Sequence, residues 1–406
     1  MNKVIFNQIY RRVLFLAFTA AFALMQSACK KDTTGGAPVI TSVRNYAASP
    51  ADTLVSFITT GQRVVLIGHH LRDALQISFN GVPATVSSIM FSDTSATVLV
   101  PDVIPFPSVP AESLNTIRYV TKQGATTFTF GIVAPPPTIG SISNENANAG
   151  DSVYISGLNL FFINKITFAG TSITNYRVAG DGTSIGFVVP ALSQSGPVVI
   201  DTKSGIVSTT FNVNDSTTGV LCNFDNINSF SWGTGTDNSS VNFPGNRGYY
   251  AVLNNDVLPA GDDTWWNWQR SINTGDQVQW LPVDSLSVPV DQYAVKFEIN
   301  VPGPWSGTSI YVVKDNSSAY MARYEPWQNA DGTVRPFTKK GWHTVTLPLS
   351  GFRASDGKGD VAASLTTLLG STAKGSINIH TKNFTASPSA SGLKAAIDNI
   401  RLVKIK

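Results

Sequence analysis

This sequence contains little cysteine, no large excess of positive or negative charge, and few long apolar runs. The 406 residues include only Cys29 and Cys222, too few for a disulfide framework. The formal charge of +3 comes from Lys3, Arg11 and Arg12, and the rest of the chain balances 26 basic against 26 acidic residues. Nucleic-acid binding normally needs a basic surface, so we expect no nucleic-acid partner.

The one long apolar run, residues 13–25, follows a basic start and precedes Ser27-Ala28-Cys29. This pattern predicts a secretory signal peptide over residues 1–28, because a membrane-spanning helix needs about 20 apolar residues. A retained membrane helix is the alternative. The small pair before Cys29 resembles the bacterial lipobox, although Gln26 replaces its usual aliphatic residue. That resemblance implies a diacylated Cys29, and a cysteine lost with the signal peptide is the other interpretation. Cys222 would then be a small buried hydrophobic residue.

The charged segment Lys30-Lys31-Asp32 follows Cys29 directly. It resembles the signal that sends lipoproteins to the outer surface in the Bacteroidetes. The resemblance implies an outer-membrane protein, anchored through lipid at residues 29–37 and facing the cell exterior. Two or three acyl chains would make this anchor durable.

An internal repeat organises the first half of the chain. Residues 61–101 align without gaps with residues 150–190, at a constant offset of 150 − 61 = 89, so that Gly68 matches Gly157 and Phe79 matches Phe168. Short β-branched runs separated by glycine turns, including the hairpin signal Asn80-Gly81, predict strands in each copy. The closing turns at Gly124 and Gly205 are only 81 residues apart, which predicts an insertion in the first copy around residues 105–112.

About seven short strands per copy predict immunoglobulin-like β-sandwiches at residues 38–135 and 136–214. The order Gly-x-x-Val, Phe-x-Gly, Val-Pro and a final glycine turn resembles the TIG (also called IPT) family. In bacterial surface lipoproteins that family implies spacer domains. The run Pro135-Pro136-Pro137 predicts a stiff joint between the copies. His69 and His70 lie at a turn of the first copy and lack the further ligands that a metal site would need.

Tryptophan is absent from the first 231 residues and occurs eight times afterwards. Alternating patterns at residues 293–299, 309–313, 342–347 and 397–403 predict strands, and we expect a larger jelly-roll-like β-sandwich over residues 215–406. The fold class is therefore all-β throughout. A domain of this size needs two or three tryptophans for its core, so several indoles are expected at the surface.

Exposed indoles suggest sugar binding, because the apolar C–H face of a pyranose stacks on an aromatic ring. In an extended segment Trp266 and Trp268 would share one face, with Trp265 opposite. Trp305 lies in a Pro/Gly loop and is the third candidate platform. Tyr324 and Trp327 form a further loop-like cluster in which Arg323 and Glu325 would bond sugar hydroxyls. Trp280 and Trp342 are expected in the core, and Trp232 is left open.

Together, the predicted lipidation, the two TIG-like domains and the Trp-rich sandwich resemble surface glycan-binding lipoproteins encoded beside TonB-dependent importers. The segments Tyr324-Glu325-Pro326-Trp327 and Gly341-Trp342 match the type whose terminal domain binds xyloglucan. The resemblance implies non-catalytic capture of a β-linked glycan. It also implies delivery to an outer-membrane importer and its glycan-binding lipoprotein partner.

Two other function classes remain open from the residues alone. A glycoside hydrolase would need two carboxylates flanking the bond, for which the terminal domain offers Glu298 and Glu325. A protein-binding adhesin would also use immunoglobulin-like arrays and tryptophan-rich contacts. No cofactor is expected, although the aspartates at 262–263 and at 356 and 360 would suit a structural calcium ion.

Overall fold

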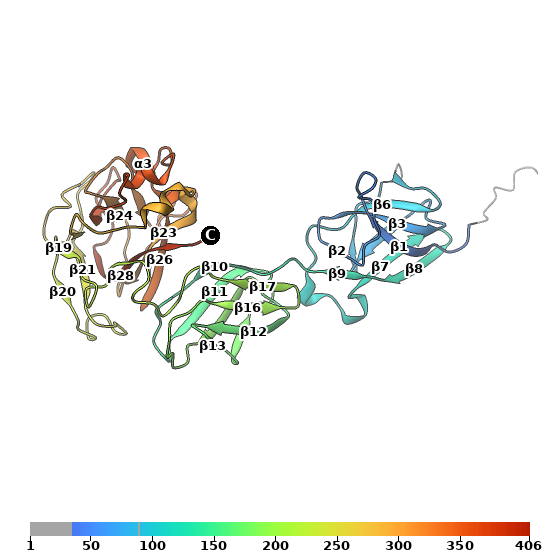
Figure 1. The fold of residues 1–406 in the computed structure, drawn as a ribbon, viewed down its shortest axis with the longest axis horizontal. Coiled ribbons are helices and arrows are strands. Elements are labelled where there is room, and N and C mark those ends of the chain that lie inside the picture. The colour runs from blue at the N-terminus through green and yellow to red at the C-terminus, as the bar shows by residue number, and fades with distance from the viewer. Residues whose placement is uncertain (1–34, 88–89) are drawn as a thin grey trace, which may run out of the picture. The chain divides into compact units, whose positions relative to one another are not determined.

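The computed structural model describes residues 35–87 and 90–406, and strands dominate both of its units (Figure 1). The predicted signal peptide and Cys29 lie outside the described residues. The chain divides into two compact units, residues 1–135 and 136–406. The described part holds no helix that is long and apolar enough to cross a membrane. The predicted all-β fold class is confirmed.

The first unit is an immunoglobulin-like domain built from three small sheets, ordered β1-β3-β6, β5-β4-β7-β8 and β2-β9. Its strands are β1 (Val39–Asn45), β2 (Phe57–Thr59), β3 (Arg63–His69), β4 (Gln76–Phe79), β5 (Val82–Pro83), β6 (Ser95–Leu99), β7 (Thr116–Thr121), β8 (Gly124–Thr129) and β9 (Gly131–Val133). Two 3-10 turns, η2 (Phe106–Ser108) and η3 (Ala111–Ser113), occupy the predicted insertion.

The second unit begins with another immunoglobulin-like domain, made of two four-stranded sheets ordered β10-β11-β15-β14 and β13-β12-β16-β17. Its strands are β10 (Thr138–Ile142), β11 (Ser152–Leu158), β12 (Ile163–Phe168), β13 (Thr171–Ser172), β14 (Tyr176–Val178), β15 (Ser184–Val188), β16 (Val199–Thr202) and β17 (Gly205–Ser208).

The sequence repeat is a repeat of structure. Strands β11 and β15 begin 89 positions after β3 and β6, the offset found in the sequence. Gly68 and Gly157 share one role, because a Cβ atom at either would lie 1.8–1.9 Å from a carbonyl oxygen of the neighbouring strand. Only glycine permits this close approach, which accompanies a register shift in the strand paired with each one.

The C-terminal domain is a sandwich of two antiparallel sheets. One sheet has the order β20-β21-β28-β23-β26, with β18 also paired to β28, and the other has the order β19-β22-β27-β24-β25. We call them the inner-joint sheet and the platform sheet. The inner-joint sheet contains β18 (Val220–Cys222), β20 (Thr236–Asp237), β21 (Tyr250–Asn255), β23 (Tyr293–Asn300), β26 (Trp342–Pro348) and β28 (Leu393–Lys404). The platform sheet contains β19 (Phe230–Trp232), β22 (Ser271–Thr274), β24 (Ser309–Lys314), β25 (Ala322–Tyr324) and β27 (Ile377–Lys382).

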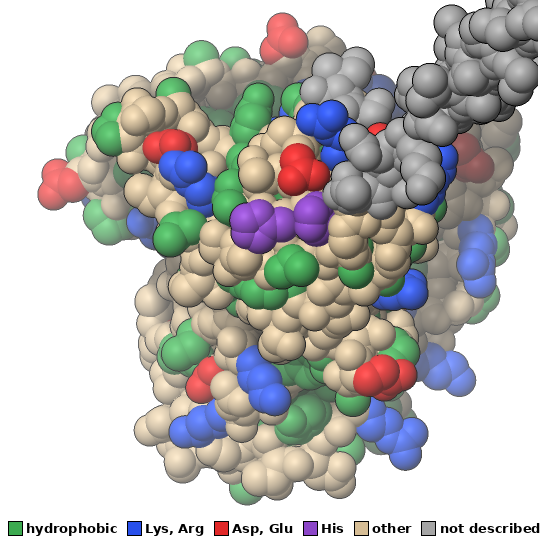
Figure 2. All heavy atoms as spheres, turned by 90° about the vertical axis from the view of Figure 1, so that its right-hand side faces the viewer, with side chains coloured by type: hydrophobic (Ala, Val, Ile, Leu, Met, Phe, Trp, Pro, Cys, Tyr) green, Lys and Arg blue, Asp and Glu red, His purple; other side chains and the backbone are tan. Residues whose placement is uncertain are grey.

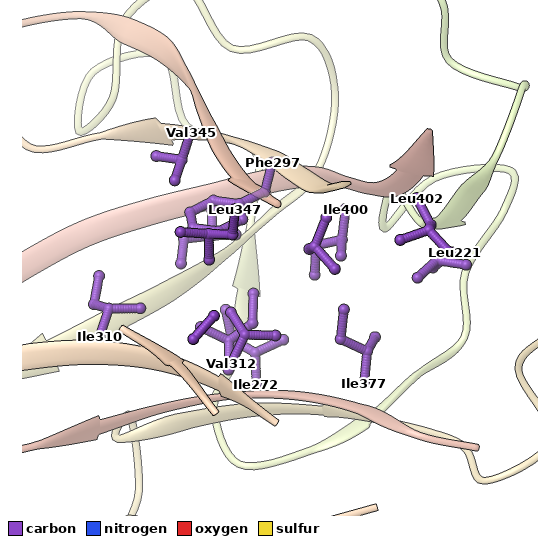
Figure 3. Close-up of a cluster of buried hydrophobic side chains, with 14 of the residues drawn as sticks. Leu221, Ile272, Phe297, Ile310, Val312, Val345, Leu347, Ile377, Ile400 and Leu402 are labelled. Atoms are coloured by element: carbon purple, nitrogen blue, oxygen red, sulfur yellow. The ribbon is translucent and has the colours of Figure 1, made fainter. Parts of the chain in front are cut away.

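Short helical segments connect some of these strands. They are η4 (Val283–Ser287), η5 (Val290–Gln292), η6 (Leu349–Gly351), α2 (Ala354–Gly357) and α3 (Leu365–Leu369). The apolar core fills the space between the two sheets, as Figure 3 shows for side chains such as Phe297 from one sheet and Ile310 and Val312 from the other. Cys222 is buried in this core and unpaired, as predicted.

Strand β23 departs from the predicted alternation, because nearly all its side chains are buried. Val295, Phe297 and Ile299 face the core. The intervening Lys296 and Glu298 would normally face water, but the second immunoglobulin-like domain covers them. Lys296 Nζ lies 2.5 Å from Glu145 Oε1 of that domain, and Asn146 Nδ2 donates to Glu298 Oε1 at 3.0 Å.

Arg401 on β28 completes this buried ionic joint between the two domains. Its Nη2 atom lies 2.5 Å from Glu145 Oε2 and 3.4 Å from Glu298 Oε1, and its side chain is fully buried. Burying a charge pair costs several kcal/mol per ion, so such a network adds little stability. Losing one partner would nevertheless strand a buried charge, so we infer that the network fixes how the two domains fit together.

Asp398 adds a carboxyl group at the same joint that forms no ion pair among the described residues. It stands directly opposite Glu298 in the strand pairing and lines a small polar cavity of about 60 Å³ with Asp225 and Arg247. Burial raises the pKa of Asp398 to about 8, and the negative charges of Glu298 and Asp225 act in the same direction. Asp398 therefore holds a proton in the folded protein at pH values where it is ionised in the unfolded chain.

This linkage predicts how Asp398→Asn changes the pH dependence of stability. Because the pKa of Asp398 is higher in the folded protein than in the unfolded chain, its contribution to the free energy of unfolding is complete below pH 3.8. That contribution is lost as the pH rises through about 8, at up to about 1.4 kcal/mol per pH unit. Asparagine removes this loss. We therefore expect the variant to gain stability over the wild type between pH 6.5 and 8, measured by denaturant unfolding.

The window lies above the range where the buried His343 and His380 act in the opposite sense, since their pKa values are lowered to about 4 and about 3. Asp256→Asn, at an exposed position of the same domain, is the matched control. An identical pH slope in the Asp398→Asn variant and the wild type would contradict the linkage.

Candidate functional site

The eight tryptophans separate into a buried group and a surface group. Trp280, Trp305 and Trp327 are buried in the core, and Trp342 is partly buried beside Tyr250. The surface group consists of Trp232, at the end of β19 in the platform sheet, and of Trp265, Trp266 and Trp268, in the loop before β22. The core assignment of Trp280 is confirmed, whereas Trp342 also lines the cavity at the joint between the domains.

The prediction that Trp305 and Trp327 are exposed is wrong. Trp305 has no exposed surface, and both indole Nε1 atoms donate to the same carbonyl oxygen, that of Thr308, at 2.6 and 3.0 Å. The Pro/Gly loop does not project into solvent, because the chain after Trp327 returns and Phe337 pairs with Trp305 through backbone hydrogen bonds. A buried ring offers no face to a sugar.

The other residues of the predicted loop cluster point in two directions. The Tyr324 ring packs inward between Trp305 and Phe337, and its hydroxyl lies 3.3 Å from His343 Nε2. Arg323 and Glu325 lie on the opposite face, where Arg323 Nη1 is 3.4 Å from Glu325 Oε1. Tyr324 is therefore a core residue, and Arg323 and Glu325 remain candidates.

The outward face of the platform sheet places residues from five strands in register. Strand pairing puts Ser271, His380, Tyr311 and Arg323 opposite one another in one row across β22, β27, β24 and β25. A second row runs through Trp232, Asn273, Asn378 and Val313. The side chains between these positions, such as Ile272 and Ile379, enter the core.

Polar side chains of this face are buried and bonded to each other. Asn273 Oδ1 accepts from Asn378 Nδ2 at 2.9 Å and lies 3.0 Å from His380 Nε2, while His380 Nδ1 lies 3.3 Å from the Tyr311 hydroxyl. Burial lowers the pKa of His380 to about 3, so its imidazole is neutral at physiological pH. A connected, neutral network of this kind holds its members in fixed orientations.

Trp265 lies flat on this network. Its ring stacks on the imidazole of His380 with centroids 4.1 Å apart and planes within 6° of parallel. Trp232 and Trp266 flank it, with ring centroids 6.0 and 5.7 Å from that of Trp265. The imidazole thus supports Trp265 from below, and three indoles form one contiguous aromatic surface.

Trp266 and Trp268 project from the same loop and are 59% and 68% exposed, in agreement with their predicted exposure. The segment is a succession of turns, however, and not the extended strand in which Trp266 and Trp268 would share one face. Two ion pairs hold the loop to the sheet, Arg270 with Asp262 at 3.0 Å and Lys382 with Asp263 at 3.0 Å. Exposed indoles on an anchored loop lose little conformational entropy when a ligand binds.

Phe384 extends the aromatic surface beyond Tyr311. Its ring centroid lies 5.8 Å from that of Tyr311, with the guanidinium carbon of Arg323 at 3.4 Å and Lys382 Nζ at 4.6 Å. Among the described residues, Arg323 Nε is buried and has no hydrogen-bond partner. Two cationic side chains therefore lie against the aromatic face, and that of Arg323 is only 10% exposed.

The structure also locates the residues of the alternative interpretations. Glu298 is buried at the domain joint on the inner-joint sheet, whereas Glu325 follows β25 of the platform sheet, so the two do not flank one cleft. Asp262 and Asp263 are engaged by the ion pairs above, and the described residues hold no cluster of three acidic, histidine or cysteine side chains suited to a metal ion. His69 is exposed and His70 lies 3.8 Å from Asp93, and the histidines in view in Figure 2 lie at the surface.

Sequence reasoning missed His380, Tyr311, Asn273 and Phe384. Their signal was present in part, since Tyr311 lies in the predicted strand at residues 309–313, and Asn273 and His380 are polar residues that alternate with apolar ones. Which face of each strand met the core, and which strands were neighbours, depends on long-range pairing that the sequence does not specify.

Comparison with known proteins places the domains in a family context. Residues 213–404 match the family model described as the surface glycan-binding protein B xyloglucan binding domain. An IPT/TIG domain-containing protein of Bacteroides ovatus is 23% identical over 227 residues, which cover 52% of this chain. The match covers only 46% of that relative, so the chain aligns with about half of its length.

Solved structures show a similar fold. The crystal structure of the surface glycan-binding protein PbSGBP-B from Prevotella bryantii has a TM-score of 0.67 at 18% identity, covering 91% of this chain and 99% of that one. A surface glycan-binding protein B from a complex xyloglucan utilisation locus of Bacteroides uniformis has a TM-score of 0.49 at 18% identity, covering 91% and 100%. At 18% identity, the likeness to the Prevotella bryantii structure concerns the fold alone.

The burial of Trp305 predicts that its loss affects folding and not ligand contact. Trp305→Ala should lower the free energy of unfolding by about 3–5 kcal/mol, because it leaves a cavity in the core, while the Thr308 carbonyl keeps its hydrogen bond from Trp327. Trp268→Ala should change stability by less than about 0.5 kcal/mol, since that ring is exposed. Thermal and denaturant unfolding of both variants would test this, and equal losses of stability would contradict the assignment.

Proposed function

We propose that this chain captures a polysaccharide at the cell surface without cleaving it, a function that the match of residues 213–404 to the surface glycan-binding protein B xyloglucan binding domain supports. The observation that carries the proposal is the aromatic platform, which we define as Trp232 of β19 together with Trp265, Trp266 and Trp268 of the loop before β22. The proposed ligand class is a β-linked glucan such as xyloglucan.

The platform suits a pyranose for two physical reasons. Equatorial hydroxyls of a β-linked sugar leave apolar C–H faces that stack on indole rings. Trp265 is already held flat by His380, so its ring is oriented before the ligand arrives. Arg323, Lys382 and Asp263 lie on the same sheet face and would bond sugar hydroxyls at its margin.

The magnitude of binding fits capture and release. Covering about 100 Å² of sugar per ring at about 25 cal/mol per Å² contributes roughly 2.5 kcal/mol. Three rings give on the order of 7 kcal/mol before the cost of association, which is at least about 4 kcal/mol. We therefore expect dissociation constants from micromolar to millimolar, so that the polymer is released again after capture.

The absence of catalysis is part of the proposal. The two glutamates of the terminal domain are on different sheets, and Glu298 is enclosed between Arg401 and Asn146. Burial raises the pKa of Glu298, and Arg401 acts against that shift. The two glutamates therefore do not form the pair of carboxylates that hydrolysis of a glycosidic bond needs. This separation supports binding without cleavage.

We also propose a lipid anchor at Cys29 and delivery of the glycan to an outer-membrane TonB-dependent importer with its glycan-binding lipoprotein partner. The support is the N-terminal sequence and the family of the terminal domain. The two immunoglobulin-like domains would then act as spacers between the membrane and the aromatic platform.

Single-ring variants test the proposal directly. Trp265→Ala, Trp266→Ala and Trp268→Ala would be titrated by calorimetry and affinity electrophoresis against xyloglucan, mixed-linkage glucan, mannan and xylan. Loss of one stacked ring, at roughly 2.5 kcal/mol, should weaken binding about 50-fold.

Tyr249→Ala is the matched control, because it removes an exposed aromatic ring elsewhere in the same domain and should leave affinity unchanged. A wild-type chain that binds none of the four glycans would overturn the function. Wild-type affinity in each of the three single variants would overturn the site, and binding of a protein ligand but of none of the glycans would favour an adhesin.

A further inference from the structure

A second candidate site lies on the second immunoglobulin-like domain, away from the aromatic platform. A groove of about 780 Å³ runs along β11, β14 and β15, within the size range of ligand sites. Its polar lining consists of hydroxyl and amide side chains and the single charged residue Arg177, without any carboxylate. Such a lining suits a ligand rich in hydroxyl groups.

Strand register sets three residues of this groove side by side. Gly186 on β15 pairs with Tyr154 on β11 and with Arg177 on β14. A Cβ atom at position 186 would lie only 2.9 Å from a Tyr154 ring carbon, so the tyrosine ring occupies the space over the glycine. The ring is 58% exposed. Tyr154 therefore leans along the sheet and shows one of its faces to solvent.

Arg177 on β14 lies opposite Gly186, and its side chain has no interaction partner among the described residues. In the described part of the chain, its guanidinium takes part in no hydrogen bond, ion pair or ring contact. Arginine is charged at every physiological pH and carries five N–H donors. An aromatic ring and a free set of donors thus stand on either side of a residue without a side chain.

The first immunoglobulin-like domain provides an internal comparison. At the repeat offset of 89, Tyr154 and Gly186 correspond to Val65 and Thr97, which pair in the same register on β3 and β6. The same fold is therefore built with a valine and a threonine at these positions. The tyrosine and glycine of the second domain are not required by the fold, and this points to a separate role.

We propose that Tyr154, Gly186 and Arg177 form a second sugar-binding site, in which a pyranose ring of the captured polysaccharide stacks on Tyr154 and Arg177 donates to its hydroxyls. The inference rests on the proposed function. Because the buried ionic joint of Glu145, Lys296 and Arg401 links this domain to the terminal one, both sites belong to one compact unit. A long polymer would engage both, and the second contact would be effectively intramolecular.

Substitutions that copy the first domain test this site with little risk to folding. Tyr154→Val and Tyr154→Val/Gly186→Thr, made in the full chain, reproduce the Val65 and Thr97 pair. We expect either to weaken binding of long-chain xyloglucan about tenfold in affinity electrophoresis. A chain that lacks the Trp265, Trp266 and Trp268 rings should keep a residual retardation by the polymer. Adding Tyr154→Val to that chain should abolish it.

Tyr46→Ala is the matched control. This tyrosine of the first domain is 54% exposed, and its loss should leave the affinity for the polymer unchanged. A wild-type chain that binds polymer while both Tyr154 variants bind it equally well would overturn the second site and leave the proposed function intact. A wild-type chain that binds no glycan would overturn the proposed function together with the second site.

Discussion

The strict alternation of side chains along β22, β27 and β24 is the constraint on which the candidate site depends. One face of these strands must supply the apolar core, so residues such as Ile272, Ile379 and Val312 turn inward. The other face then carries Asn273, His380 and Tyr311. Because Trp265 and Phe384 cover that face, its polar groups are buried and must bond to one another. The aromatic platform is therefore built on a fixed polar layer.

The same constraint acts differently in the opposite sheet. There the second immunoglobulin-like domain covers the outward face, and Lys296, Glu298 and Arg401 are enclosed with Glu145. Lys296 Nζ also lies 3.5 Å from the ring centroid of Phe211 in that domain. Domain packing thus removes the outward face of the inner-joint sheet from solvent, while the exposed indoles adjoin the platform sheet. Among known physical uses of buried ions, fixing one arrangement against others fits this joint best.

Much of the architecture could be predicted from the sequence, because it depends on local signals. The 89-residue repeat, the Asn80-Gly81 hairpin and the insertion before β7 all rest on turn chemistry and strand patterns. The site could be predicted only in part. Trp266 and Trp268 were found by composition, but the fate of Trp305 depended on the return of Phe337 over its ring, a contact 32 positions away. His380 became relevant only through pairing with β22 and β24, more than 60 residues distant.

We propose that the four surface indoles contact the ligand while the buried indoles serve the fold, and the indole N–H resonances of the eight tryptophans test this most directly. Titration of the ¹⁵N-labelled chain with a xyloglucan oligosaccharide should shift the signals of Trp232, Trp265, Trp266 and Trp268. Those of Trp280, Trp305 and Trp327, whose Nε1 atoms are bonded inside the core, should stay in place. Saturable shifts confined to the buried tryptophans, or the absence of shifts in the four surface indoles when the sugar binds, would contradict the claim.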